Sequence, residues 1–204
     1  MRDEPAALSE DAVDPDPFKQ FAAWFADAGT AGEVLPEAMT LATATRDGRP
    51  SARMVLLKGF DAQGFGFFTN YESGKGRELA ENPRAALVLY WSKLGRQVRI
   101  SGDVVKQTSE ESATYFHSRP ALSQLSASVS QQSAVIPNRA VLEEGMAELA
   151  ARYQGTQVPL PPTWGGYRVR PTTIEFWVHR DNRLHDRIRY TRTTPGWRIE
   201  RLSP

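Results

Sequence analysis

The sequence contains no cysteine and only three histidines among its 204 residues. The lack of thiols excludes disulfides, thiolate-bound zinc, iron–sulfur clusters and cysteine nucleophiles, and it fits an intracellular protein. Charge of one sign is not in excess either: 25 Lys and Arg residues face 24 Asp and Glu residues, a net charge of +1. We therefore expect no nucleic-acid partner. The spacing of the histidines favours no metal site.

Long apolar runs are also missing. No stretch approaches the roughly 18 apolar residues that a membrane-spanning helix needs, so no membrane association is expected. Residues 1–15 are acidic and contain proline, with neither the basic nor the apolar region of a secretory signal. We expect a flexible N-terminal segment over residues 1–15, one domain over residues 16–204, and a cytoplasmic location.

The pattern of turn signals and apolar residues predicts a mostly antiparallel fold. Asp16 followed by Pro17 marks a helix start. From residue 39 to residue 107, short β-like runs follow one another with connections short enough for antiparallel pairing. We predict an α+β fold, a closed or nearly closed antiparallel barrel surrounded by helices. The expected strands are 39–45, 51–60, 65–70, 85–91, 97–105, 166–178 and 197–202. The expected helices are 16–29, 75–81, 108–118 and 141–153.

A chain with so few catalytic side-chain types favours chemistry on a bound organic cofactor, so the basic residues deserve examination. Arg53 and Lys58 flank an apolar strand, and their five-residue separation would send them to opposite faces. They could equally be strand-edge cations in solvent. The segment 73–77, SGKGR, lies between a strand and a helix. It could present N–H groups and an ammonium to a phosphate, or be an ordinary glycine-rich turn.

A second group of polar residues surrounds the end of the helix expected at 108–118. Tyr115 and Arg119 are four residues apart, so they would share one face of a continuing helix, and Ser123 follows shortly after. A phenol, a guanidinium and a hydroxyl together suit a phosphate ester. The alternative is a helix-end arginine beside a packed tyrosine.

The segment 183–187, RLHDR, is the densest cluster of functional side chains. If it is extended, Arg183, His185 and Arg187 project from one face. The two guanidiniums would then favour a neutral imidazole that can donate or accept a hydrogen bond. The alternative is a charged hairpin with internal ion pairs.

Taken in order along the chain, a series of segments resembles the pyridoxamine 5'-phosphate oxidase family, flavin enzymes that make pyridoxal 5'-phosphate. The matching segments are RMVLLKGF (53–60), FFTNYES (67–73), KGREL (75–79), NPRA (82–85), RQVR (96–99), YFHSRP (115–120), QS (132–133), WGGYR (164–168), IEFW (174–177) and RLHDR (183–187).

This resemblance implies an antiparallel split β-barrel with peripheral helices that forms a homodimer. FMN would lie at the subunit interface, and each site would be built from both chains. The implied FMN contacts are Arg53, Met54, Val55, Leu56, Leu57, Lys58, Phe68, Thr69, Lys75, Gln97, Gln132, Ser133, Trp177 and Arg187. The implied substrate contacts are Lys58, Tyr115, Arg119, Ser123, Arg183 and His185, of which Arg183 and His185 are the expected catalytic residues.

The implied reaction is the oxidation of pyridoxamine or pyridoxine 5'-phosphate to pyridoxal 5'-phosphate, with oxygen reduced to hydrogen peroxide. The chain departs from the family pattern at Gly74, where an arginine is usual, at residues 125–130, which lack the usual tryptophan and glycine, and at residues 178–179. Two alternatives follow: a phenazine-biosynthesis-type FMN oxidase, whose members resemble the polar 125–130 segment, and a non-catalytic flavin- or tetrapyrrole-binding split barrel.

Overall fold

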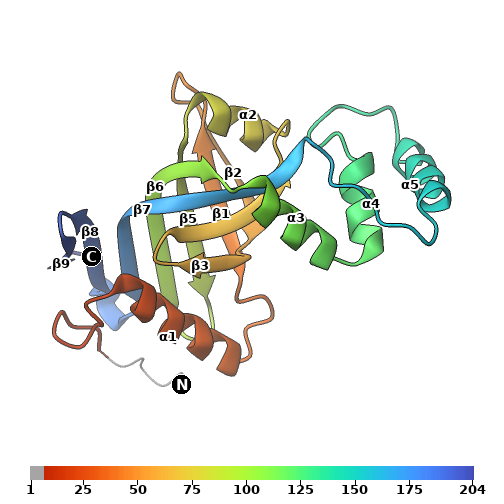
Figure 1. Cartoon of the computed structure of the whole chain (residues 1–204). Coiled ribbons are helices and arrows are strands. Elements are labelled where there is room, and N and C mark those ends of the chain that lie inside the picture. Colours follow the sequence, from red (N-terminus) through yellow and green to blue (C-terminus); the bar gives the residue numbers. More distant parts are fainter. Residues whose placement is uncertain (1–6) are drawn as a thin grey trace.

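The computed structural model describes residues 7–204, and its strands form one antiparallel sheet that curls into half of a barrel (Figure 1). The predicted α+β split barrel is thereby confirmed. Neighbouring strands follow the order β2-β1-β5-β6-β7-β4-β3, and β8 joins β7 to β9. The strands are β1 (Ala38–Ala44), β2 (Pro50–Leu56), β3 (Gly59–Asp61), β4 (Gly64–Asn70), β5 (Arg84–Trp91), β6 (Arg96–Lys106), β7 (Trp164–Val178), β8 (Asp186–Thr193) and β9 (Gly196–Arg201).

Strand β7, which is 15 residues long, connects the two ends of the sheet. One of its edges pairs with β6 from Tyr167 to Val178. The other edge pairs with β4 from Trp164 to Val169, and then with β8 from Thr173 to Val178. Because both edges are hydrogen-bonded, β7 is held extended, and its two ends lie far apart.

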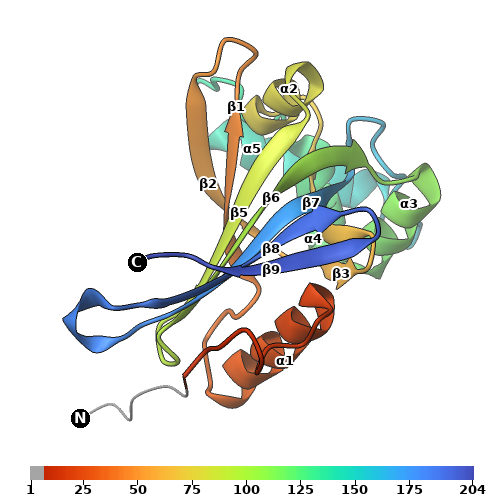
Figure 2. The same cartoon turned by 90° about the vertical axis from the view of Figure 1, so that its left-hand side faces the viewer.

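The helices are α1 (Pro17–Thr30), α2 (Gly74–Glu81), α3 (Ser109–Ser118), α4 (Ala121–Val129), α5 (Ala140–Arg152) and the short 3-10 helix η1 (Asp181–Arg183). Asp16 caps α1 as predicted, since its Oδ1 accepts the N–H of Phe18 at 2.9 Å. Helix α4 was not among the expected helices. Helices α3, α4 and α5 lie together on the side of the sheet away from β8 and β9 (Figure 2).

Aromatic side chains fill the space between α1 and the sheet. Phe21 of α1 is fully buried, and its ring lies 4.7 Å from Phe60, 4.9 Å from Phe65 and 6.0 Å from Trp91, measured between ring centroids. The contacts with Phe60 and Phe65 are edge-to-face, and contacts of this kind add to the free energy gained by burying apolar area. The aromatic face of α1 therefore holds this helix against β3, β4 and β5.

Residues 7–16 run along the C-terminal strands. Leu8 and Val13 are buried, and the hydroxyl of Tyr190 on β8 donates to the backbone oxygen of Asp14 at 2.6 Å. Residues 1–6 of the expected flexible segment lie outside the described residues. Within residues 7–204, the structure contains no helix that is both long enough and apolar enough to cross a membrane.

The substitution Phe21→Ala should lower the free energy of unfolding by about 3–5 kcal/mol, because it leaves a cavity among rings that cannot close over it. Chemical denaturation measures this loss. The control Val34→Ala, at a residue that is 90% exposed, should change the free energy by less than about 0.5 kcal/mol. Equal effects of the two substitutions would contradict the packing of α1 described above.

Candidate functional site

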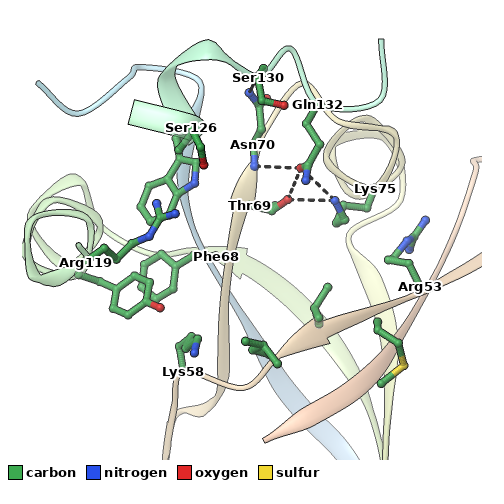
Figure 3. Close-up of a pocket in the computed structure, with 16 residues that line it drawn as sticks. Arg53, Lys58, Phe68, Thr69, Asn70, Lys75, Arg119, Ser126, Ser130 and Gln132 are labelled. Atoms are coloured by element: carbon green, nitrogen blue, oxygen red, sulfur yellow. Dashed lines mark hydrogen bonds between the residues drawn. The ribbon is translucent and has the colours of Figure 1, made fainter. Parts of the chain in front are cut away.

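A cavity of about 580 Å³ opens where β2, β4, α2, α3, α4 and the start of β7 meet (Figure 3). Many of the residues implied by the family resemblance line it: Arg53, Met54, Val55, Leu56, Lys58, Phe68, Thr69, Lys75, Tyr115, Arg119 and Gln132. The cavity therefore gathers residues from positions 53 to 132, which are far apart in the sequence.

Lys75 forms the first cationic corner of the cavity. Its ammonium is buried and donates to Thr69 Oγ1 at 3.0 Å, Gln132 Oε1 at 3.1 Å and Ser73 Oγ at 3.3 Å. All three acceptors are neutral oxygens. Burial lowers the pKa of Lys75 and the charge of Arg53 lowers it further, against the opposing effect of Glu78. A buried ammonium with neutral partners is suited to hold an anion.

The turn before α2 places further donors beside Lys75. Ser73 caps the helix, with its Oγ accepting the N–H of Gly76 at 3.2 Å, and the N–H of Gly74 donates to Ser133 Oγ at 3.2 Å. Gly76 is required here, because a side chain at this position would overlap the backbone oxygen of Tyr71. The N-terminus of α2 thus adds its partial positive charge to this corner.

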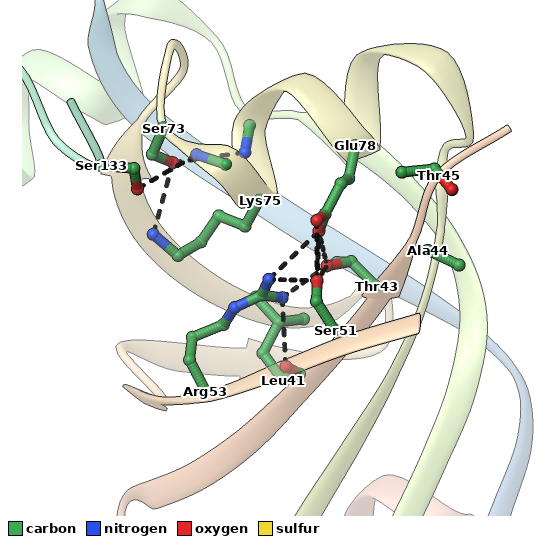
Figure 4. Close-up of polar contacts among 12 residues, drawn as sticks. Leu41, Thr43, Ala44, Thr45, Ser51, Arg53, Ser73, Lys75, Glu78 and Ser133 are labelled. Atoms are coloured by element: carbon green, nitrogen blue, oxygen red, sulfur yellow. Dashed lines mark hydrogen bonds and ion pairs between the residues drawn. The ribbon is translucent and has the colours of Figure 1, made fainter. Parts of the chain in front are cut away.

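Arg53 lies next to Lys75 but is already paired with a carboxylate (Figure 4). Its Nη2 donates to Glu78 Oε2 at 3.1 Å and to Ser51 Oγ at 2.6 Å, and its Nη1 donates to the backbone oxygen of Leu41 and to Thr43. Burial raises the pKa of Glu78, but hydrogen bonds from Thr43, Ser51 and Arg53 more than offset this, so its pKa lies below the ordinary value. Arg53 is thereby fixed in one orientation.

Arg119 forms the second cationic corner, across the cavity from Lys75 (Figure 3). Its guanidinium stacks 5.0 Å from the ring centroid of Trp164, and its Nη2 donates to the backbone oxygen of Ser123 at 2.8 Å. Its Nη1 is buried and has no hydrogen-bond partner among residues 7–204. Burial lowers the pKa of Arg119, although Tyr115 opposes this. An unpaired buried N–H on a cation calls for an anionic acceptor.

Aromatic rings form the wall between Arg119 and the sheet. Phe68 stacks on Tyr115 at 4.0 Å and on Trp164 at 5.3 Å, measured between ring centroids. This stack fixes the plane against which Arg119 lies, and it gives the cavity one flat apolar side.

Arg53 and Lys58 line the same cavity, so the prediction that they face opposite sides is wrong. Strand β2 ends at Leu56, and the N–H of Lys58 donates to Gly66 across the sheet. Alternation therefore stops before Lys58. Leu57 is buried in the main core.

The remaining implied residues lie at the other end of β7. Trp177 pairs in register with Gln97 of β6 and with Arg187 of β8. Arg187 Nε donates to Glu175 Oε1 at 2.8 Å, and the ring of His185 lies 4.6 Å from that of Trp177. These residues form a second cluster, separate from the cavity.

Of the two alternatives for the segment 183–187, the extended one holds only for its second half. Arg183 ends η1 and has a left-handed backbone with φ of 62°, and β8 begins only at Asp186. Arg183 is exposed, whereas His185 and Arg187 are half-buried. The other alternative, a charged hairpin with internal ion pairs, agrees with the pairs Arg180–Asp186 and Arg187–Glu175.

Sequence reasoning gave no role to several residues that line the cavity: Asn70, Ser126, Ala127, Ser130 and Trp164. Asn70 and Trp164 lie inside segments that carry the family resemblance, so the segments themselves were the available signal. The serines come from α4 and the residue that follows it, and the sequence indicated only that this segment is polar. Within the described part of the chain, no group of three or more His, Cys, Asp or Glu residues is placed to hold a metal ion.

Comparison with known proteins matches nearly the whole chain. The sequence model described as pyridoxamine 5'-phosphate oxidase matches residues 32–153, and the one described as the pyridoxine 5'-phosphate oxidase C-terminal dimerisation region matches residues 164–204. A pyridoxine/pyridoxamine 5'-phosphate oxidase of Rubrobacter xylanophilus is 57% identical over 199 residues, 98% of this chain and 92% of the relative.

Two solved structures extend the comparison to the fold. PhzG from Burkholderia lata, in complex with tetrahydrophenazine-1-carboxylic acid, has a TM-score of 0.92 and 36% identity, covering 98% of this chain and 100% of its own. A pyridoxamine 5'-phosphate oxidase-related, FMN binding protein from Nostoc punctiforme has a TM-score of 0.73 with the same coverage. Its identity is only 18%, so this second likeness concerns the fold alone.

The substitution Glu78→Gln should lower the free energy of unfolding by about 1–3 kcal/mol at neutral pH, because Arg53 loses its charged partner. The pKa of Glu78 in the folded protein is below 4.5. The stability that its carboxylate contributes is therefore present above pH 4.5 and is lost as the pH falls through the lowered pKa.

Denaturant unfolding of the unsubstituted protein and of Glu78→Gln, over a series of acid pH values, measures the difference in their free energies of unfolding. This difference should shrink toward zero as the pH falls. Glu81→Gln, at an exposed residue at the end of the same helix, is the control and should behave like the original chain. A difference that stays constant with pH would contradict the role given to Glu78.

Proposed function

The chain belongs to the pyridoxamine 5'-phosphate oxidase family, and we propose that its cavity binds FMN and a B6 phosphate together at the interface of a homodimer. The protein is an oxidoreductase that oxidises pyridoxamine or pyridoxine 5'-phosphate to pyridoxal 5'-phosphate. The proposed electron acceptor is oxygen, with hydrogen peroxide as the second product.

One observation carries this proposal: a single cavity has two separate cationic corners, and the ammonium of Lys75 in one and the guanidinium of Arg119 in the other contact no carboxylate among the described residues. Lys75 has only neutral hydrogen-bond acceptors, and Nη1 of Arg119 is a buried donor without a partner among the described residues. Leaving such groups unpaired costs free energy, which a bound phosphate recovers. Two phosphate sites fit a cofactor and a substrate that each carry one phosphate.

The donors of the first corner suit the phosphate of FMN. Lys75 would supply the charge, and the N-terminus of α2 and the hydroxyl of Ser133 would supply neutral donors. Arg53, paired with Glu78, would lie beside the phosphate, and Thr69 would hold Lys75 and Gln132 in place. Gln132 already contacts both Lys75 and Thr69, so it holds this corner together.

The second corner suits the substrate phosphate. Arg119 would bind it through Nη1, with Lys58 and the hydroxyl of Tyr115 beside it, as all three line the cavity. Ser123 supports this indirectly, because its backbone oxygen orients Arg119. The stack of Trp164 and Phe68 keeps the guanidinium in place.

We assign Gln97, Trp177, Arg183, His185 and Arg187 to the site of the opposite subunit. They lie at the far end of β7, and residues 164–204 match the dimerisation region of the family. In a twofold dimer, each chain can give its second cluster to the cavity of its partner.

When bound, FMN supplies the acceptor for a hydride from C4' of the substrate and passes the electrons to oxygen. The protein's own task is orientation. Arg119, Lys58 and Tyr115 would anchor the substrate by its phosphate, while Arg183 and His185 of the opposite subunit would contact its ring. The imidazole of His185 is half-buried beside Trp177. From there it would orient the ring and donate or accept a proton at a polar substituent of the substrate.

A phenazine-type oxidase is the second candidate. It is favoured by the high structural similarity to PhzG and by the polar cavity wall formed by Ser126 and Ser130. Incubation of the purified protein with pyridoxamine 5'-phosphate in air separates the two. The proposed function requires pyridoxal 5'-phosphate, followed by its absorbance, and hydrogen peroxide in equal amount. If neither product forms, the first proposal fails.

Substitution of the two cationic corners should have separate effects. Arg119→Ala should raise KM for pyridoxamine 5'-phosphate by about 10- to 100-fold, because a charge-assisted hydrogen bond to the phosphate is lost, and should leave FMN affinity nearly unchanged. Lys75→Ala should weaken FMN binding by a similar factor. Flavin fluorescence titration and steady-state kinetics measure the two quantities. If both variants lose flavin and substrate equally, the division between corners is wrong.

Two impaired variants should complement each other when they are mixed and assayed at a substrate concentration well below the raised KM of Arg119→Ala. A dimer of Arg119→Ala with Arg183→Ala has one site in which both chains contribute intact residues. The mixed dimer should therefore recover about half of the activity of the unsubstituted dimer. The mixture is made by co-expression with two affinity tags, and activity is assayed on the doubly tagged dimer.

The pair Arg119→Ala and Lys75→Ala is the control, because both residues line the cavity of the same chain. Their mixed dimer has no intact site and should recover nothing. Recovery in the control, or none in the test pair, would contradict a site shared between subunits.

A further inference from the structure

The carboxylate of Asp186 joins three separate parts of the chain. It lies between His185 and Arg187 at the start of β8, and its side chain is only 18% exposed. Its Oδ2 accepts from Arg180 Nε at 2.8 Å and from the backbone N–H of Leu8 at 3.2 Å, and its Oδ1 accepts from Arg201 Nη1 at 2.9 Å. Residues 7–16, the turn after β7 and the end of β9 therefore meet at one side chain.

The arginine on the opposite side of Asp186 extends this connection. Arg201 Nη2 donates to the backbone oxygen of Leu8 at 2.8 Å and to Glu10 Oε2 at 2.8 Å. The next residue, Leu202, donates its N–H to the backbone oxygen of Arg187 at 2.9 Å. The N-terminal segment and the C-terminus thus both brace the strand on which Arg187 stands.

Arg180 transmits the position of Asp186 to the imidazole of His185. Its side chain is held on Asp186, and its backbone N–H donates to Nδ1 of His185 at 3.1 Å. Because Nδ1 accepts this hydrogen bond, the proton of the neutral ring is on Nε2. The ring therefore presents an N–H donor on its free side, in an orientation fixed by Arg180 and by the face of Trp177.

We propose that Asp186 is a positioning residue, which holds the turn 180–185 so that His185 is kept as the Nε2–H tautomer and offers a hydrogen-bond donor to the substrate. This inference rests on the proposed function only for the identity of the substrate. The positioning itself concerns contacts within one chain. Burial raises the pKa of Asp186, but hydrogen bonds from Arg180, Leu8 and Arg201 more than offset this and keep the carboxylate charged.

The proposal predicts an effect on turnover rather than on binding of the substrate phosphate. Arg119 and Lys58, which would hold that phosphate, line the cavity, whereas the hydrogen bonds of Asp186 go to Arg180, Leu8 and Arg201. Loosening the turn should therefore misplace a donor that acts on the ring while the phosphate anchor stays intact. A misplaced group of this kind lowers kcat and leaves KM nearly constant.

The test compares Asp186→Asn with Asp181→Asn, the same change at an exposed aspartate of the same turn. Nitrogen-15 NMR of histidine-labelled protein, purified with its flavin, reports the tautomer directly, and only three histidines contribute signals. His185→Gln identifies the signals of His185. The original chain and D181N should show a single Nε2–H form, whereas D186N should show mixed tautomers.

In steady-state kinetics on pyridoxamine 5'-phosphate, D186N should lower kcat by about 10- to 100-fold with KM changed by less than about threefold. D181N should match the original chain in both. If D186N does not fold, Arg201→Gln replaces it. This substitution removes the hydrogen bond from Arg201 to Asp186 Oδ1, and the arginine side chain is 42% exposed, so the protein should tolerate its loss. It should shift the tautomer in the same direction.

An unchanged tautomer in D186N would overturn the positioning role, whatever the kinetics show. A changed tautomer with unchanged kcat would overturn the functional part of the proposal. A changed tautomer in a protein whose original chain does not oxidise pyridoxamine 5'-phosphate would uphold the positioning and refute the proposed function, so the two can fail separately.

Discussion

A single strand keeps apart the two residue clusters that the proposed reaction needs together. Trp164 borders the cavity at one end of β7. Trp177, thirteen residues further along the strand, lies beside His185. A fully extended strand of that length would span at most about 40 Å; β7 bends at the irregularity beside Pro171, but the partners on both of its edges prevent it from folding back on itself. One chain cannot close this gap by a side-chain movement. A symmetric pair of chains can, because the clusters of the two copies can face each other.

The cations that line the cavity also differ in whether the chain itself supplies a partner of opposite charge. Arg53 is satisfied within the chain by Glu78, and Ser51 and Thr43 complete that network. Lys75 and Arg119 are not balanced in this way, since their contacts are neutral oxygens and an aromatic ring. Burying a cation without an anion is unfavourable, so an anionic partner at either corner would stabilise the fold.

Much of the site could be predicted from the sequence, because the motifs that carry it are local. The turn at residues 73–77, the helix end at Tyr115 and Arg119, and the α+β barrel were all predicted and are present. The errors arose where local geometry changes within a motif. Strand β2 ends two residues before Lys58, so a period of two no longer applies there. Arg183 adopts a left-handed backbone that a pattern of alternating residues cannot reveal. The contacts of Asp186 join segments at both ends of the chain, and only the folded structure brings them together.

The most direct test of the account is a crystal structure of the purified, flavin-loaded protein. It should contain a twofold dimer in which the phosphate of each FMN contacts Lys75 of one subunit, while Trp177 and Arg187 of the other subunit reach the same flavin. A monomer, or a flavin whose contacts all come from one chain, would contradict the claim that β7 divides the site between two copies.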